Sequence, residues 1–280
     1  MILLFLSILP VFLLGRYIYR TDFEKEPTGM LVGLFFMGIG SVAVTLALTL
    51  ILSNIIPFFA MSDGEITILG LIPYIYIGVA LIEEFSKWIF VYLFAYHHYE
   101  FNHAYDAIVY AVFVSLGFAC LENIMYVFNS GITTSGISTA LLRAITAVPG
   151  HACFGVLIGY YLGLAKTADK HQNKEISKKN KIKSLLFPIL AHGTYDFLIF
   201  GSAQIPFFFL LFIVFVVFLF SKTIDKVRQM SRVHFDIRES SFIPTPPVPI
   251  PLTHEYRFCP MCGEKVIGKF CARCGYQHIK

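Results

Sequence analysis

The hydrophobic residues of this chain fall into long runs that are separated by short polar stretches. Runs of this length are typical of helices that cross about 30 Å of hydrocarbon. The pattern predicts an all-α, polytopic bundle of about seven membrane spans, at residues 2–19, 28–54, 71–96, 106–128, 137–165, 184–202 and 206–221. The last two runs are short and close together, so they are consistent with two full crossings or with a helical hairpin or re-entrant pair.

The composition excludes a soluble domain. Hydrophobic residues make up 56% of the chain and charged residues 14%, and the mean hydropathy is +0.69. Such a chain is too apolar to have a fully hydrated surface. No basic residue precedes the first apolar run, and Arg16 and Arg20 lie at its C-terminal end. We therefore expect an uncleaved first span rather than a signal peptide.

Basic residues are distributed unevenly among the connections between the runs. Three lie at or just after the end of the first run, seven lysines lie in residues 166–183, and three more begin the tail, whereas residues 54–69 and 129–136 contain no lysine or arginine. With seven spans, every basic connection lies on one side, which the positive-inside rule identifies as the cytoplasm. We expect a multi-pass protein of the cell membrane with its N-terminus outside and its tail inside. This bias accounts for the net charge of +4, so no nucleic-acid partner is expected.

The tail differs in composition from the rest of the chain. Residues 1–222 form the predicted membrane domain, residues 223–256 a cytoplasmic linker that is proline-rich near its end, and residues 257–280 a small module. The module contains the pattern C-x2-C-x8-C-x2-C, formed by Cys259, Cys262, Cys271 and Cys274. Because the cytoplasm is reducing, this spacing predicts a structural zinc ribbon rather than two disulfides. Nothing in the sequence indicates the partner of this ribbon.

Ionisable and polar residues lie inside four of the apolar runs, where charge is costly. At 1.5 Å per residue, the predicted orientation places them within one layer of the membrane. Polar residues with unrelated structural roles would lie at different depths in the membrane. The residues of one site that is assembled from several helices must instead lie at a similar depth. The candidate site residues are Glu83, Glu84, Lys87, Glu122, Asn123, His151, His192 and Asp196.

Two pairs of these residues are one helical turn apart. Lys87 follows Glu83 by four residues and can keep a glutamate ionised, and Asp196 follows His192 by four residues and can orient its ring. The alternative for either pair is a structural ion pair that stabilises the bundle. Arg143 is expected to snorkel or to pair with Glu122 rather than to take part in chemistry.

Four sequence motifs carry a family resemblance. "EEFSK", "GFACLEN", "RAITAVPGHACFG" and "HGTYD" occur in this order on successive runs. Together they resemble the PrsW family of intramembrane proteases, relatives of CAAX-processing proteases. The resemblance implies a paired-glutamate motif at Glu83 and Glu84 that, with histidines, activates water without a metal. It also implies functional roles for the second and last motifs, and substrates such as membrane-anchored anti-sigma factors.

The predicted function is therefore hydrolysis of a peptide bond of a membrane protein within the lipid bilayer. One of the paired glutamates would take a proton from water, and Asn123 or His192 would donate to the oxyanion. Which glutamate is the base stays open, and no catalytic metal is expected. Two alternatives remain: a metalloprotease with zinc bound by glutamates and histidines of the four runs, and a non-catalytic transporter or scaffold.

Overall fold

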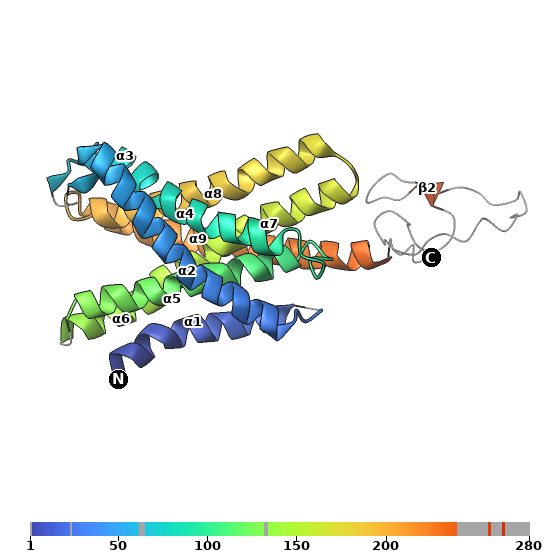
Figure 1. Cartoon of the computed structure of the whole chain (residues 1–280), viewed down its shortest axis with the longest axis horizontal. Helices are drawn as coiled ribbons and strands as arrows, with labels where there is room; N and C mark the ends of the chain where they lie inside the picture. The colour runs from blue at the N-terminus through green and yellow to red at the C-terminus, as the bar shows by residue number, and fades with distance from the viewer. Residues whose placement is uncertain are drawn as a thin grey trace, which may run out of the picture. The chain divides into compact units, whose positions relative to one another are not determined.

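The computed structural model describes residues 2–22, 24–61, 65–131, 134–239, 257–258 and 265–266. The chain separates into two compact units, residues 1–231 and 232–280. Every regular element that the structure describes in the first unit is a helix (Figure 1). Its elements are α1 (Ile2–Thr21), α2 (Thr28–Ile55), η1 (Pro57–Ala60), α3 (Leu71–Pro73), η3 (Tyr74–Leu81), α4 (Ile82–Phe90), η4 (Val91–Ala95), α5 (Asp106–Asn129), α6 (Thr134–Ile145), α7 (Ala147–Lys170), α8 (Lys174–Gly201) and the start of α9 (Phe207–Glu239).

Six helical stretches of the described chain are long and apolar enough to cross a membrane, which confirms a multi-pass membrane protein. They are α1, α2, α5, the stretch formed by α6 and α7, α8 and α9. Both α8 and α9 reach this length, so the last two predicted runs are each sufficient for a full crossing.

The third predicted run, at residues 71–96, does not form one uninterrupted α-helix. It is helical from Leu71 to Ala95, but π-helical turns at η3 and η4 flank the α-helical segment α4. No single helix in this run therefore reaches the length of a span. This is why six rather than seven spans are found by length and composition. Short π-helical segments are frequent at functional sites, and α4 carries the charged "EEFSK" motif.

Helix α5 forms the centre of the bundle and is its most buried span. It packs against α7, α2 and α1, and Figure 1 shows α2 crossing over it. Glycines allow the helix backbones to approach closely: a Cβ atom at Gly117 would collide with the carbonyl oxygen of Phe35, and one at Gly159 with that of Ala107. The central helix thus brings the polar residues of its neighbours within reach of one another.

The second unit, residues 232–280, is described only in part. It contains the end of α9 and two short strands, β1 (Arg257–Phe258) and β2 (Lys265–Val266), which pair antiparallel with Arg257 opposite Val266. The four cysteines of the predicted zinc ribbon lie outside the described residues, so the ribbon stays a prediction.

Candidate active site

The charged motif on α4 lies at the centre of the polar cluster. Lys87 is fully buried, and its Nζ lies 2.5 Å from Glu84 Oε1 and 3.8 Å from Glu83 Oε2. The same Nζ lies 3.2 Å from His151 Nδ1 on α7 and 4.4 Å from the ring centre of Phe118. Lys87 therefore pairs with a glutamate as expected, but the nearer one is Glu84, one residue closer in sequence than Glu83.

His192 on α8 connects the paired glutamates to Asp196. Its Nδ1 lies 2.8 Å from Glu84 Oε1, and its Nε2 lies 3.2 Å from Asp196 Oδ2 and 3.9 Å from Glu83 Oε2. The ring stacks on Phe154 of α7 at 4.8 Å between centroids. Both ring nitrogens thus face carboxylates, and the aromatic contact fixes the ring plane.

Glu122 and Arg143 form the other side of the cluster. Glu122 Oε2 lies 2.9 Å from His151 Nε2 and 2.5 Å from Arg143 Nη2. Arg143 comes from α6, and its guanidinium lies 4.1 Å from the ring centre of Tyr126. Of the two expectations for Arg143, the structure shows pairing with Glu122.

Asn123 is buried behind this side of the cluster. Its Nδ2 donates to the backbone carbonyl of Ser7, and its Oδ1 accepts from Arg143 Nε, each at 2.9 Å. One of its two N–H groups and its oxygen are therefore bonded within the framework, and the side chain is fully buried. Asn123 thus contacts Arg143 in the structure, and its role at the oxyanion stays a prediction.

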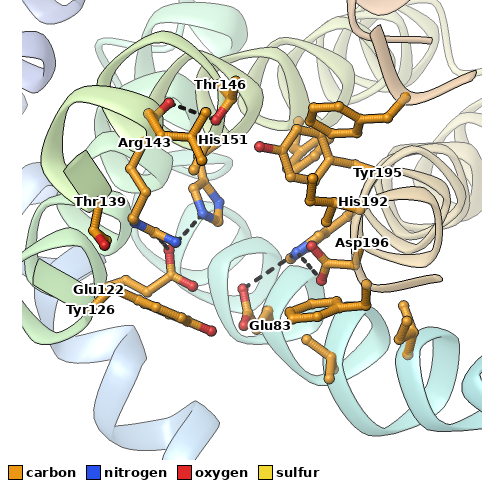
Figure 2. A pocket seen from close by; sticks show the side chains of 18 of the residues that line it. Glu83, Glu122, Tyr126, Thr139, Arg143, Thr146, His151, His192, Tyr195 and Asp196 are labelled. Carbon is orange, nitrogen blue, oxygen red and sulfur yellow. Dashed lines mark hydrogen bonds and ion pairs between the residues drawn. The ribbon is translucent and has the colours of Figure 1, made fainter. Parts of the chain in front are cut away.

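A cavity of about 430 Å³ lies between these helices (Figure 2). Tyr74, Ile75, Phe154 and Phe212 contribute to its apolar walls. Its ionisable lining residues come from five elements and are Glu83, Glu122, Arg143, His151, His192 and Asp196. The structure therefore brings five of the eight predicted site residues to one cavity.

The other three predicted residues lie behind the cavity wall. Glu84 and Lys87 are fully buried, as is Asn123. Glu83 is 12% exposed at its side chain, and its buried Oε2 accepts no hydrogen bond from the described residues. The two adjacent glutamates thus differ in access: Glu83 faces the cavity and Glu84 faces the framework behind it.

Two tyrosines of the cavity were missed from the sequence. The hydroxyl groups of Tyr126 and Tyr195 point into the cavity in Figure 2. Tyr126 follows Glu122 by four residues and Tyr195 follows His192 by three, so helical spacing from a recognised site residue is the signal that could have found them.

The residues of the site have the donor set of a divalent-cation site. Glu83, Glu84 and His192 offer ligand atoms within 4.8 Å of one another, and so do Glu83, Glu122 and His151. In the first group, one oxygen each of Glu83 and Glu84 accepts no hydrogen bond from the described residues. Glu84 also faces His192 Nδ1, and metal-binding histidines commonly use such a carboxylate partner. These residues therefore fit a metal ion.

The fold and the cavity define the class of this protein: a multi-pass membrane protein with an ionisable centre enclosed by its helices. Comparison with known proteins identifies the family. Residues 26–221 match the family described as "PrsW family intramembrane metalloprotease". The chain belongs to the PrsW family and is an intramembrane protease. This finding confirms the resemblance and excludes the transporter or scaffold alternative. The family is described as one of metalloproteases, which argues against a metal-free centre.

Individual relatives give the same result. The chain is 39% identical to protease PrsW of Oceanobacillus iheyensis over 214 residues, which cover 74% of this chain and 90% of the relative. It is 31% identical to protease PrsW of Bacillus subtilis over 227 residues, covering 80% of this chain and 95% of the relative. No solved structure matches the chain.

Proposed function

We propose that this protein hydrolyses a peptide bond of a membrane protein within the bilayer, and that Glu83 activates the attacking water. The observation that supports this role is that Glu83 lines the cavity, whereas Glu84 does not. Glu84 is instead fully buried, with Oε1 near both Lys87 and His192. Glu84 thus serves as a positioning residue that holds those two side chains.

The proposed reaction begins with a water molecule beside Glu83. Glu83 takes one proton from this water, and the resulting hydroxide adds to the carbonyl carbon of the scissile amide. His192, whose Nε2 lies on the cavity side near Asp196, donates to the developing oxyanion. Glu83 then passes its proton to the leaving nitrogen as the C–N bond breaks. The carboxylate is thereby regenerated, so protons balance over one turnover.

The net charge of the cluster favours a second candidate for the activation of water, which is a bound divalent cation. Four carboxyl groups of the cluster, at Glu83, Glu84, Glu122 and Asp196, are accompanied by two basic side chains, Lys87 and Arg143. Two buried negative charges without compensation are costly. Protons on His192 and on one carboxylate would compensate them, and so would a divalent cation. A cation held by Glu83, Glu84 and His192 would polarise the attacking water.

The first experiment identifies the substrate and tests the function. Membrane proteins are compared between cells that carry the parent protein and cells that carry Glu83→Gln, whose carboxamide accepts no proton at neutral pH. We expect at least one membrane protein, such as an anti-sigma factor, to accumulate uncut in the variant and to appear as fragments with the parent. An identical set of fragments in both cells would overturn the proposal.

The second experiment separates the two ways of activating water. Metal content and cleavage of the identified substrate are measured on the full chain with all four tail cysteines replaced by serine, because those thiols would bind zinc themselves. A metal-free centre predicts cleavage that survives chelators. The metal-dependent form predicts instead that this cysteine-substituted protein binds a metal ion and that chelators inhibit its cleavage. It also predicts that adding Glu83→Gln with His192→Ala abolishes the binding of the metal ion.

The orientation of the protein belongs to the same proposal. The distribution of basic residues along the membrane unit supports an N-terminus outside and a tail in the cytoplasm. A cytoplasmic tail would keep Cys259, Cys262, Cys271 and Cys274 reduced and able to bind a structural zinc ion. The tail lies beyond the residues that match the family, so its role is to recruit or regulate rather than to catalyse.

A further inference from the structure

A second cavity, of about 450 Å³, lies between α4 and the first turns of α8, and it shares no residue with the active-site cavity. One part of its wall is basic and the other part is apolar. The basic side chains are Lys174, Lys178 and Lys181, and the apolar ones include Trp88, Ile182 and Leu185. The cavity is therefore amphipathic.

The basic part of this cavity has uncompensated positive charge. Lys181 pairs with Asp169 at 3.0 Å, and Asp169 also accepts a hydrogen bond from the hydroxyl of Tyr96. The one carboxylate in the wall is therefore already neutralised. Lys174 and Lys178 are exposed, and no described acidic residue pairs with them. The N-terminal end of α8 adds a partial positive charge at the same place.

The apolar part lies beside the start of the predicted apolar run of α8, which is where a membrane's headgroups are expected to meet its hydrocarbon. Trp88 Nε1 donates to Ser184 Oγ at 2.8 Å, and the predicted apolar run of α8 begins at residue 184. Trp88 also stacks on Tyr92 at 4.8 Å between ring centres. Tryptophan and tyrosine are enriched at membrane interfaces. The lysines precede this level along α8, so they lie on its polar side.

We propose that this cavity binds an anionic phospholipid, with the headgroup phosphate between Lys174 and Lys178 and the start of an acyl chain along Ile182 and Leu185. Basic cavities beside membrane helices are suited to such headgroups. An acidic peptide would satisfy the lysines, but it would leave the apolar wall, with its exposed Ile182, without a matching group. A lipid satisfies both parts at once.

The chain contains a single tryptophan, and Trp88 lines this cavity. Its fluorescence therefore reports directly on the ligand. The full chain is placed in phosphatidylcholine nanodiscs that contain a small fraction of phosphatidylglycerol, with bromine on the acyl chains of one lipid at a time. We expect brominated phosphatidylglycerol to quench Trp88 with an apparent affinity at least about fivefold higher than brominated phosphatidylcholine, because each lysine contributes about fivefold at an anionic surface.

Two double variants of equal charge make this test specific. Lys174→Gln with Lys178→Gln should abolish the preference for phosphatidylglycerol. Lys179→Gln with Lys183→Gln, on the same helix but outside the cavity, should retain it. An equal loss in both variants would mean a general surface charge effect and would overturn the site. Loss of the preference on adding inorganic phosphate or a soluble acidic peptide at millimolar concentration would likewise overturn a lipid as the occupant.

Discussion

Glu83 and Glu84 are adjacent in sequence, but their different surroundings predict different consequences of the same substitution. Glu83→Gln removes a proton acceptor at the cavity, so cleavage should fall by about 10² to 10⁴ while the melting temperature stays near that of the parent. Glu84→Gln removes the carboxylate nearest to buried Lys87, so it should also destabilise the fold by about 3–5 kcal/mol. Cleavage of the identified substrate and thermal melting in detergent measure both effects.

The exposed Glu175, in the first turn of α8, provides the matched control. Glu175→Gln changes the same charge and should alter neither cleavage nor melting. A Glu83→Gln protein that still cleaves at close to the parental rate would refute the role of Glu83 as base. Equal melting temperatures for Glu84→Gln and the parent would show that Glu84 does not hold the framework.

The sequence predicted which ionisable residues converge, because charge inside an apolar run requires partners. It could not predict which of the two glutamates faces the cavity. Neighbours on a helix point about 100° apart, and both glutamates lie against His192, which is far away in the chain. The local spacing indicated the Lys87–Glu83 pair, whereas tertiary contacts favour Lys87–Glu84.

Glu26, in the connection between α1 and α2, leads to a prediction of how the stability of the fold depends on pH. Burial, followed by the charges of Asp22 and Glu100, raises its pKa to about 7 although the hydroxyl of Tyr110 donates to it. The folded protein thus binds this proton more tightly than the unfolded chain, so stability should fall as pH rises from about 4.5 to about 7. The full effect is at most about 3 kcal/mol.

Melting temperatures between pH 5 and pH 8 test this prediction. The substitution Glu26→Gln removes the titrating proton but keeps an oxygen that can accept from Tyr110. Its melting temperature should therefore decline less with rising pH than that of the parent. An identical decline in both proteins would assign the pH dependence to other groups.

The close crossing of α2 and α5 is the packing feature on which the central position of α5 depends. A Cβ atom at Gly38 of α2 would collide with the carbonyl oxygen of Val114 of α5, whereas one at Gly40 would meet nothing within 4 Å. We expect Gly38→Ala to lower the melting temperature by several degrees, because backbone must move, and Gly40→Ala to leave it unchanged or slightly raised. Similar melting temperatures for the two variants would contradict this crossing.

The helices themselves were predictable from apolar run length, but the interruption of the third run was not. A run of apolar residues with one charged motif predicts a continuous span, and nothing in residues 71–96 specifies π-helical turns at η3 and η4. The turns belong to a segment that must place its charged motif against α5, α7 and α8 at once, through Phe118, His151 and His192. Such π-helical geometry depends on tertiary contacts, so it cannot be predicted from the local sequence.

The topology of the whole membrane unit depends on whether this third run crosses the bilayer. If it crosses, the chain has seven spans, and the basic residues at the C-terminal end of α1, at 166–183 and from residue 222 onward all lie on one side. If it does not cross, the six remaining spans place residues 166–183 on the side opposite to the C-terminal end of α1. The positive-inside rule favours the first arrangement.

Reporter fusions on both sides of the third run therefore provide the decisive measurement. We expect fusions near residue 63 to report the outside of the cell, and fusions near residue 100 and after residue 222 to report the cytoplasm. The reason is that only an odd number of crossings places both lysine-rich segments, at 166–183 and after 222, on the side of Arg16 and Arg20. Reporters near 63 and 100 on the same side would show that α4 enters the membrane without crossing it, and the centre of the active site would then lie on a re-entrant segment.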